Sequence, residues 1–147
     1  MVNISDALSW LVKAEPFSDS HDFTPVGVTL LTMLDFSRIL EKQRGIIESV
    51  YVYIVNRGVL DEVCYWTVKM NNFPLYYTET FRAGRKDQIK VTVPASGSYQ
   101  QAFRPGYIFN NSVSTVTIDV EFGTVNLLCT ALFTLEGYKL KAGVTTI

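Results

Sequence analysis

The clearest strand and turn signals of the chain lie in Gln-Ile-Lys-Val-Thr-Val-Pro-Ala-Ser-Gly-Ser-Tyr-Gln-Gln-Ala-Phe-Arg-Pro, residues 88–105. Apolar and polar residues alternate up to Val93, which is the period of a strand with one buried and one solvated face. Pro94 cannot donate a ladder hydrogen bond, and the small residues after it favour a turn away from the sheet. A second extended segment then ends at Pro105 and Gly106. The stretch predicts two strands joined by a turn that leaves the sheet.

Similar segments recur along the chain at spacings of roughly ten residues, with turn residues such as Asn56-Arg57-Gly58 between them. We expect strands within 26–34, 46–55, 64–70, 75–81, 88–93, 99–104, 115–122 and 125–135. No helical segment is long enough to connect parallel strands. The sequence therefore predicts an all-β fold: a single antiparallel β-sandwich of jelly-roll type with seven or eight strands.

Two of these segments make specific predictions about burial. Within 115–122 the residues alternate strictly, so one set is expected to face the core and the other to face water. The predicted buried set is Val116, Ile118, Val120 and Phe122, and the predicted exposed set is Thr117, Asp119 and Glu121. The segment Val125–Leu135 is almost continuously apolar, which predicts a strand buried on both faces, and Gly137 is expected to end it.

The first 25 residues have a different pattern from the rest. Ser5 and Asp6 precede an apolar stripe, as in a capped amphipathic helix of about ten residues that stops before Pro16. The polar segment Glu15–Pro25 is typical of a linker or arm. The predicted organisation is an N-terminal helix and arm over residues 1–25 and a β-sandwich domain over 26–147. Because so short a helix is unstable alone, we expect the arm to join subunits, and its deletion to leave a folded domain that associates less.

The composition of the 147-residue chain limits the classes of partner. Charged residues make up only 18%, where about a quarter is usual, which indicates that a partner covers part of the surface. The net charge of −1 gives no general attraction to nucleic acid or to anionic lipid. The longest apolar run is far shorter than the roughly 20 residues that span a bilayer, and the N-terminus lacks the features of a signal peptide.

No group of residues in the sequence indicates catalysis. The single histidine, His21, lies between aspartates in a segment expected to be a solvated loop, so replacing it by alanine should leave folding and function unchanged. Cys64 and Cys129 are far apart and are predicted to be buried free thiols. Asp61 and Glu62 are expected to be solvated charges in a turn. The sequence thus predicts no catalytic, cofactor-binding or metal-binding residue.

Tyrosines are the compositional feature that indicates a surface function. Tyr51, Tyr53 and Tyr65 lie on neighbouring predicted strands, together with Trp66, which is expected in the core. Tyrosine combines a flat apolar ring with a hydroxyl, which suits protein interfaces and sugar-binding platforms. The predicted interface residues are Leu8, Leu11 and Val12 from the helix, and Tyr51, Tyr53, Tyr76 and Tyr77 from the strands.

Several segments together resemble small bacteriophage virion structural proteins. They are Leu34-Asp35-Phe36-Ser37, Ile46 to Asn56, Ile89 to Ala95 with Gln100 and Pro105 after it, and the strand at 115–122. The resemblance implies a single β-domain that is part of a virion assembled in the host cytoplasm. In the virion it would decorate the capsid or tail, or serve as a minor capsid component. Its implied partners are further copies of the chain and other virion proteins.

Two functions follow from these observations. The first is a non-enzymatic virion structural protein that assembles through apolar strand faces and the N-terminal arm. The alternative is a carbohydrate-binding β-sandwich whose surface tyrosines stack on sugar rings, with a glycan as partner. Neither function requires a cofactor or a specific nucleic acid.

Overall fold

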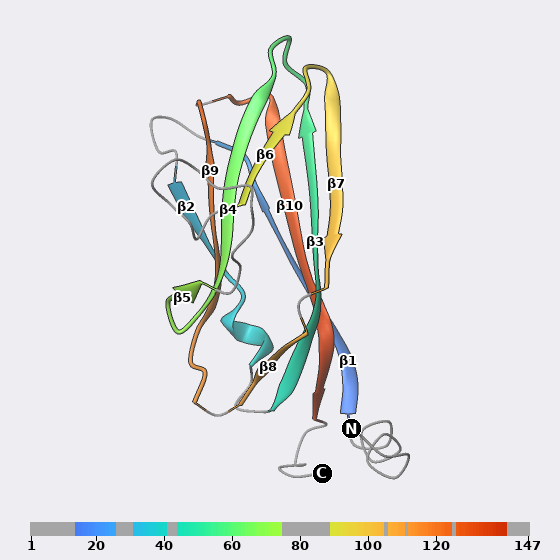
Figure 1. Cartoon of the computed structure of the whole chain (residues 1–147), viewed down its shortest axis with the longest axis vertical. Helices are drawn as coiled ribbons and strands as arrows, with labels where there is room; N and C mark the ends of the chain where they lie inside the picture. Colours follow the sequence, from blue (N-terminus) through green and yellow to red (C-terminus); the bar gives the residue numbers. More distant parts are fainter. Residues whose placement is uncertain are drawn as a thin grey trace.

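The computed structural model describes residues 14–25, 31–40, 44–74, 89–104, 106–110, 112–124 and 126–140. Over these ranges the chain forms two five-stranded antiparallel sheets that pack face to face (Figure 1). This arrangement confirms the predicted β-sandwich. The predicted N-terminal helix with Leu8, Leu11 and Val12, and the predicted strand with Tyr76 and Tyr77, lie outside the described residues.

The first sheet has the order β1 (Ala14–Phe23), β10 (Cys129–Leu140), β3 (Gly45–Asn56) and β7 (Gly97–Phe103), and the short β8 (Tyr107–Phe109) also pairs with β3. The second sheet has the order β2 (Leu31–Asp35), β9 (Val116–Phe122), β4 (Glu62–Met70) and β5 (Phe73–Pro74), and β6 (Ile89–Val93) also pairs with β4. A 3-10 turn, η1 (Ser37–Ile39), follows β2.

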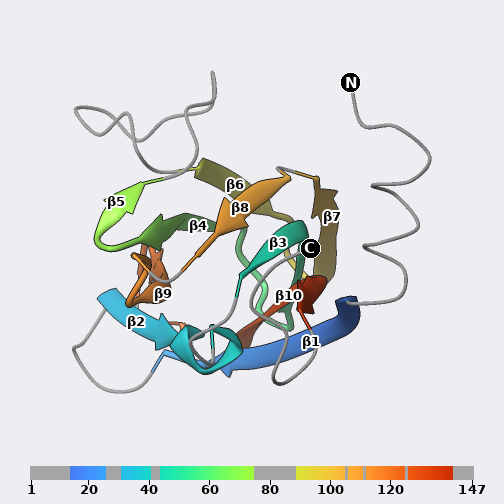
Figure 2. The same cartoon turned by 90° about the horizontal axis from the view of Figure 1, so that it is seen from below.

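The connectivity is that of a jelly roll. Strands of the first half of the chain pair antiparallel with strands of the second half in a nested order: β1 with β10, β2 with β9, β3 with β7 and β4 with β6. Successive strands from β1 to β4 alternate between the two sheets, as expected when one long hairpin rolls up on itself. Figure 2, which views the molecule from one end, shows the two sheets facing each other, and the buried hydrophobic residues form one core cluster.

The connection between β6 and β7 passes from one sheet to the other. β6 pairs with β4 in the second sheet, whereas β7 pairs with β3 in the first. Between them the backbone N–H of Gly97 donates to the carbonyl of Pro94 at 3.1 Å, and Ser96 has a φ of +52°. The structure thus confirms that the turn after Pro94 leaves the sheet.

Trp66 fills the centre of the sandwich. It is completely buried on β4, and its ring makes edge contacts with Phe103 of β7 and Phe133 of β10, at centroid distances of 5.1 and 5.6 Å. Its predicted place in the core is confirmed. The four residues of β9 predicted to face inward are also buried.

The predicted outer face of β9 is only partly correct. Thr117 and Glu121 are buried, with 5% and 8% exposure, instead of solvated. β9 is an interior strand between β2 and β4, and Leu31 and Tyr65 both lie directly opposite Glu121. Neighbouring side chains therefore cover even the outward positions, and Asp119 pairs with Lys69 at 2.7 Å.

The prediction that Glu15–Pro25 forms a linker or arm is wrong. Residues 14–23 form β1, which pairs with ten residues of β10 and completes the first sheet. Polar side chains lie on both faces of β1, so the two-residue period is not visible as an apolar pattern. The expected solvated loop around His21 is wrong for the same reason.

The burial predicted for the C-terminal part also needs correction. Gly137 lies inside β10, which continues to Leu140, and does not end the strand. Leu127 and Leu128 precede the strand in a turn and are more than half exposed. On β2 the side chains of Leu31 and Met33 face solvent, with 47% and 62% exposure.

Candidate functional site

The outer face of the first sheet carries two of the predicted interface residues. Tyr51 and Tyr53 point away from the core on β3 and are half-buried. The hydroxyl of Tyr51 donates to Oε1 of Gln100 on β7 at 3.0 Å. Tyr65 lies on the opposite side of the molecule, on the outer face of the second sheet. The structure therefore separates the strand tyrosines into two surfaces.

Hydroxyl and amide side chains surround this tyrosine pair. From β7 to β1 the outer positions are Ser98, Gln100, Ala102, Tyr51, Tyr53, Val55, Thr130, Leu132, Thr134, Glu136, Ser18, Ser20 and Asp22. Hydroxyl groups bridge neighbouring strands, as between Ser20 and Thr134 at 2.8 Å. Asp22 on β1 and Glu136 on β10 carry charge on this face, whereas the outward residues of β7 and residues 51, 53 and 55 of β3 are uncharged.

A second surface lies at one end of the sandwich, at the top of Figure 1. The β3–β4 and β9–β10 loops meet there, since the backbone N–H of Arg57 donates to the carbonyl of Leu128 at 3.0 Å. Four aliphatic residues of these loops are exposed: Val59 (87%), Leu60 (74%), Leu127 (59%) and Leu128 (51%). We call these four residues the apolar tip. Monomeric proteins rarely leave large aliphatic side chains grouped in this way.

Buried polar groups hold the loops of the apolar tip in place. The carboxylate of Glu62 accepts hydrogen bonds from the backbone N–H of Thr124 at 3.1 Å and from its hydroxyl at 2.5 Å. The side chain of Asn56 donates to the carbonyl of Leu60 at 2.8 Å and accepts from the N–H of Gly58 at 2.9 Å. Glu62 is only 5% exposed, so the prediction of a solvated carboxylate is wrong. The aliphatic side chains project from loops that are fixed by these bonds.

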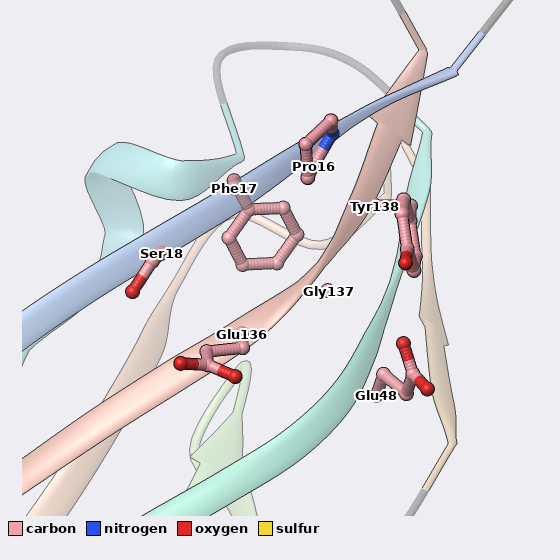
Figure 3. Close-up of a pocket in the computed structure, with 7 residues that line it drawn as sticks. All are labelled: Pro16, Phe17, Ser18, Glu48, Glu136, Gly137 and Tyr138. Atoms are coloured by element: carbon pink, nitrogen blue, oxygen red, sulfur yellow. The ribbon is translucent and has the colours of Figure 1, made fainter.

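A pocket of about 380 Å³ opens where the pairing of β3 and β10 shifts register (Figure 3). The shift leaves Glu48 of β3 without a partner residue in β10. The pocket is lined by Pro16, Phe17, Ser18, Glu48, Glu136, Gly137 and Tyr138. Tyr138 is 46% exposed, and neither carboxylate forms an ion pair within the described part of the chain.

The residues with titratable nitrogen or sulfur do not form a reactive site. His21 lies on β1, its Nε2 is 3.4 Å from a carboxylate oxygen of Asp19, and its ring packs edge-on against Phe36 at 4.5 Å. Cys64 and Cys129 are free and buried, as predicted, and burial raises the pKa of both thiols, that of Cys129 to about 11. Over the ranges that the structure describes, no group of three His, Cys, Asp or Glu residues could hold a metal ion.

The apolar tip is not among the features predicted from the sequence. The prediction for Val125–Leu135 places Leu127 and Leu128 in a buried strand, and none of the predicted strands includes Val59 or Leu60. The available signal was an apolar pair directly after the turn residues Asn56-Arg57-Gly58, where polar residues are usual. In the described segments no helix has the length and apolar character needed to cross a membrane.

No protein-family model matches the sequence, and no curated protein is similar to it in sequence. Solved structures are similar in fold. A chain of turnip yellow mosaic virus superposes with a TM-score of 0.51 and 7% identity, covering 90% of this chain and 84% of that one. A chain of the empty head of the same virus gives 0.50 and 10%, covering 89% and 84%. Tobacco streak virus coat protein gives 0.49 and 10%, covering 91% of each. The first two similarities show that this chain shares its fold with chains of a virus particle.

Proposed function

We propose that the chain is a non-enzymatic structural protein of a virus particle and that its copies assemble with one another. The apolar tip is the observation that carries this proposal. Its four exposed aliphatic residues lie on loops held by hydrogen bonds, so they form a surface on which another copy can pack. The jelly-roll fold, shared with turnip yellow mosaic virus chains, supports it. The outward residues of β7, together with Tyr51 and Tyr53 of β3, offer a further, uncharged surface for contacts within such a particle.

The energetics indicate that the apolar tip acts as one of several contacts. Fully burying a Val or Leu side chain contributes about 1.5–3 kcal/mol, and these four are between one half and nine tenths exposed. Burial of the tip therefore supplies on the order of 4–8 kcal/mol per copy, which is comparable with the roughly 4–15 kcal/mol cost of association. One tip contact does not hold two copies together in dilute solution, whereas several contacts in a closed particle do.

The finer assignments stay predictions. They are a bacteriophage origin, a role as minor capsid, decoration or tail-associated component, and contacts by Leu8, Leu11, Val12, Tyr76 and Tyr77. A deletion that tests the proposed arm must now stop at residue 13, because residues 14–23 form β1 of the first sheet.

The proposal predicts that a charge on the apolar tip prevents assembly without unfolding the chain. We expect the unmodified protein to form large particles in sedimentation and negative-stain electron microscopy, and Leu60→Asp to reduce the particle fraction at least tenfold. The reason is that assembly would bury an unpaired carboxylate, at a cost of several kcal/mol. Circular dichroism should show an unchanged fold, since Leu60 is 74% exposed.

Phe73→Asp provides the matched control for this experiment. Phe73 is 75% exposed and follows β4 at the end opposite to the apolar tip. The same loss of apolar surface and gain of charge should therefore leave particles intact. A protein that stays monomeric under all conditions contradicts the proposed function, and equal effects of the two substitutions contradict the role of the tip.

A carbohydrate-binding module is the second candidate, and the pocket beside Tyr138 favours it. The exposed ring of Tyr138 offers a stacking surface, and the carboxylates of Glu48 and Glu136 offer acceptors for sugar hydroxyls (Figure 3). On this proposal a glycan array identifies a ligand, and Tyr138→Ala weakens its binding at least tenfold. Tyr65→Ala, on the other sheet, is the control. An array without any specific ligand removes this candidate.

A further inference from the structure

The strands at the edges of the two sheets differ in how well they are protected against pairing with another strand. β1 carries Pro16 and several charged residues, β5 has two residues and includes Pro74, and β6 carries Lys90. β2 has five residues and includes Asp35. The seven residues of β7, Gly-Ser-Tyr-Gln-Gln-Ala-Phe, include no charged residue and no proline. Proteins usually block long edge strands with such residues, so β7 lacks the usual protection.

The backbone of β7 is well suited to accept another strand. All seven of its residues pair with β3 in one continuous register, without a bulge. Within the described residues no strand pairs with its other edge. In an antiparallel ladder, alternate residues direct their N–H and C=O groups to opposite sides, so about half of the polar backbone groups of β7 point away from β3. These groups form a regular row roughly 24 Å long.

We propose that β7 pairs with β7 of a second copy, antiparallel and about a two-fold axis. Centring the pair on Gln100 brings Gln100 opposite its own copy and Ser98 opposite Ala102 of the partner. All seven residues are then paired. The first sheets of the two copies become one continuous sheet, with the partner's β7 placed beside β7.

Three observations favour a second copy as the occupant. When two identical strands pair, any charged residue near the axis faces a like charge. β7 has no charged residue, so two copies of it can pair without this repulsion. A two-fold pairing is closed, so it removes the unprotected edge and leaves β1, with Pro16 and its charges, as the outer edge on both sides. Ile108 on β8, along the same side of β3, is 73% exposed and adds apolar surface beside the junction.

This inference goes beyond the virion role and does not depend on it. A dimer joined through β7 is compatible with a virus particle, and equally with a protein that forms no particle. The experiments on the apolar tip and those on β7 therefore succeed or fail separately.

A cysteine at position 100 tests the pairing directly. In the proposed register the two Cα atoms of residue 100 are about 4.5–5.5 Å apart, which is within the range of a disulfide. Gln100→Cys should give a covalent dimer under mild oxidation. The two natural thiols do not interfere, because both are buried and burial raises the pKa of each. Ser18→Cys is the matched control, since Ser18 is exposed on the outer face of the same sheet but on β1 at its opposite edge.

A charge at the same position tests the interaction without cross-linking. Gln100→Lys places two ammonium groups opposite each other on the axis, and we expect it to weaken dimerisation at least tenfold in sedimentation, whereas Ser18→Lys has no effect. The inference is overturned if the unmodified protein neither dimerises nor assembles further. It is also overturned if Ser18→Cys cross-links as readily as Gln100→Cys. Binding of a foreign peptide strand to β7, without self-association, would replace the second copy by another partner.

Discussion

Replacing Gly137 by alanine should lower the free energy of unfolding by about 3 kcal/mol or more, the upper end of the usual cost of overpacking. A Cβ at this position would collide with the backbone carbonyl of Ile46 on β3 and lie 3.0 Å from the ring of Phe17 on β1. Both obstacles belong to strands that pair with β10. Relief of the collision would require the sheet itself to shift, because the main obstacle is backbone.

Gly106→Ala is the control for the loss of a glycine as such. Gly106 has a φ of +65°, and an added Cβ would meet no atom within 4 Å. Alanine there should cost only about 1 kcal/mol, from the unfavourable backbone conformation. Urea or heat denaturation measures the difference in free energy of unfolding between the two variants. Each kcal/mol lost should lower the melting temperature by about 3 °C. Equal destabilisation would mean that β3 and β10 do not approach closely at the register shift.

The sequence predicted the parts of the fold where apolar residues alternate. The period of two up to Val93, the proline after it and the small residues of the turn correctly indicated a strand followed by a turn that leaves its sheet. The same rule placed Trp66 in the core and located β3, β4 and β9. These predictions succeeded because the hydrophobic effect alone fixes which face of such a strand is buried.

Elsewhere the tertiary structure outweighed the local pattern. β1 has polar residues on both faces, and its position is fixed by antiparallel pairing with ten residues of β10, which a local pattern does not reveal. Thr117 and Glu121 occupy outward positions, yet the strands on both sides of β9 cover them. An outward position in the middle of a sheet is therefore a poor predictor of exposure.

The candidate site was less predictable than the fold. The sequence selected Tyr51 and Tyr53, and the structure places both on one outer face, but it did not select the apolar tip. The tip joins residues 57–60 to residues 126–128, which are far apart in sequence and are brought together only when Asn56 of β3 pairs with Cys129 of β10. A surface made of two short loops has no period, so strand patterns do not detect it.

Truncating Trp66 to alanine should cost about 3–5 kcal/mol, the range for a fully buried aromatic residue. Trp66 is the side chain through which β4 of the second sheet contacts both β7 and β10 of the first, in edge contacts with Phe103 and Phe133. Each such aromatic contact contributes roughly 0.5–1.5 kcal/mol beyond the buried area. Since domains of this kind are stable by about 5–15 kcal/mol, the loss leaves a marginal fold.

The neighbouring residue provides the test of this reasoning. Tyr65 belongs to the same strand but lies half-buried on the outer face, so Tyr65→Ala should cost about 1 kcal/mol or less. Trp66→Phe keeps an aromatic ring in the core and should fall between the two alanine variants. Denaturation followed by far-ultraviolet circular dichroism measures all three, because the signal does not depend on the tryptophan that is removed. If Tyr65→Ala lowered the free energy of unfolding as much as Trp66→Ala does, the assignment of the inner and outer faces of β4 would be wrong. Tyr65, and not Trp66, would then pack between the two sheets.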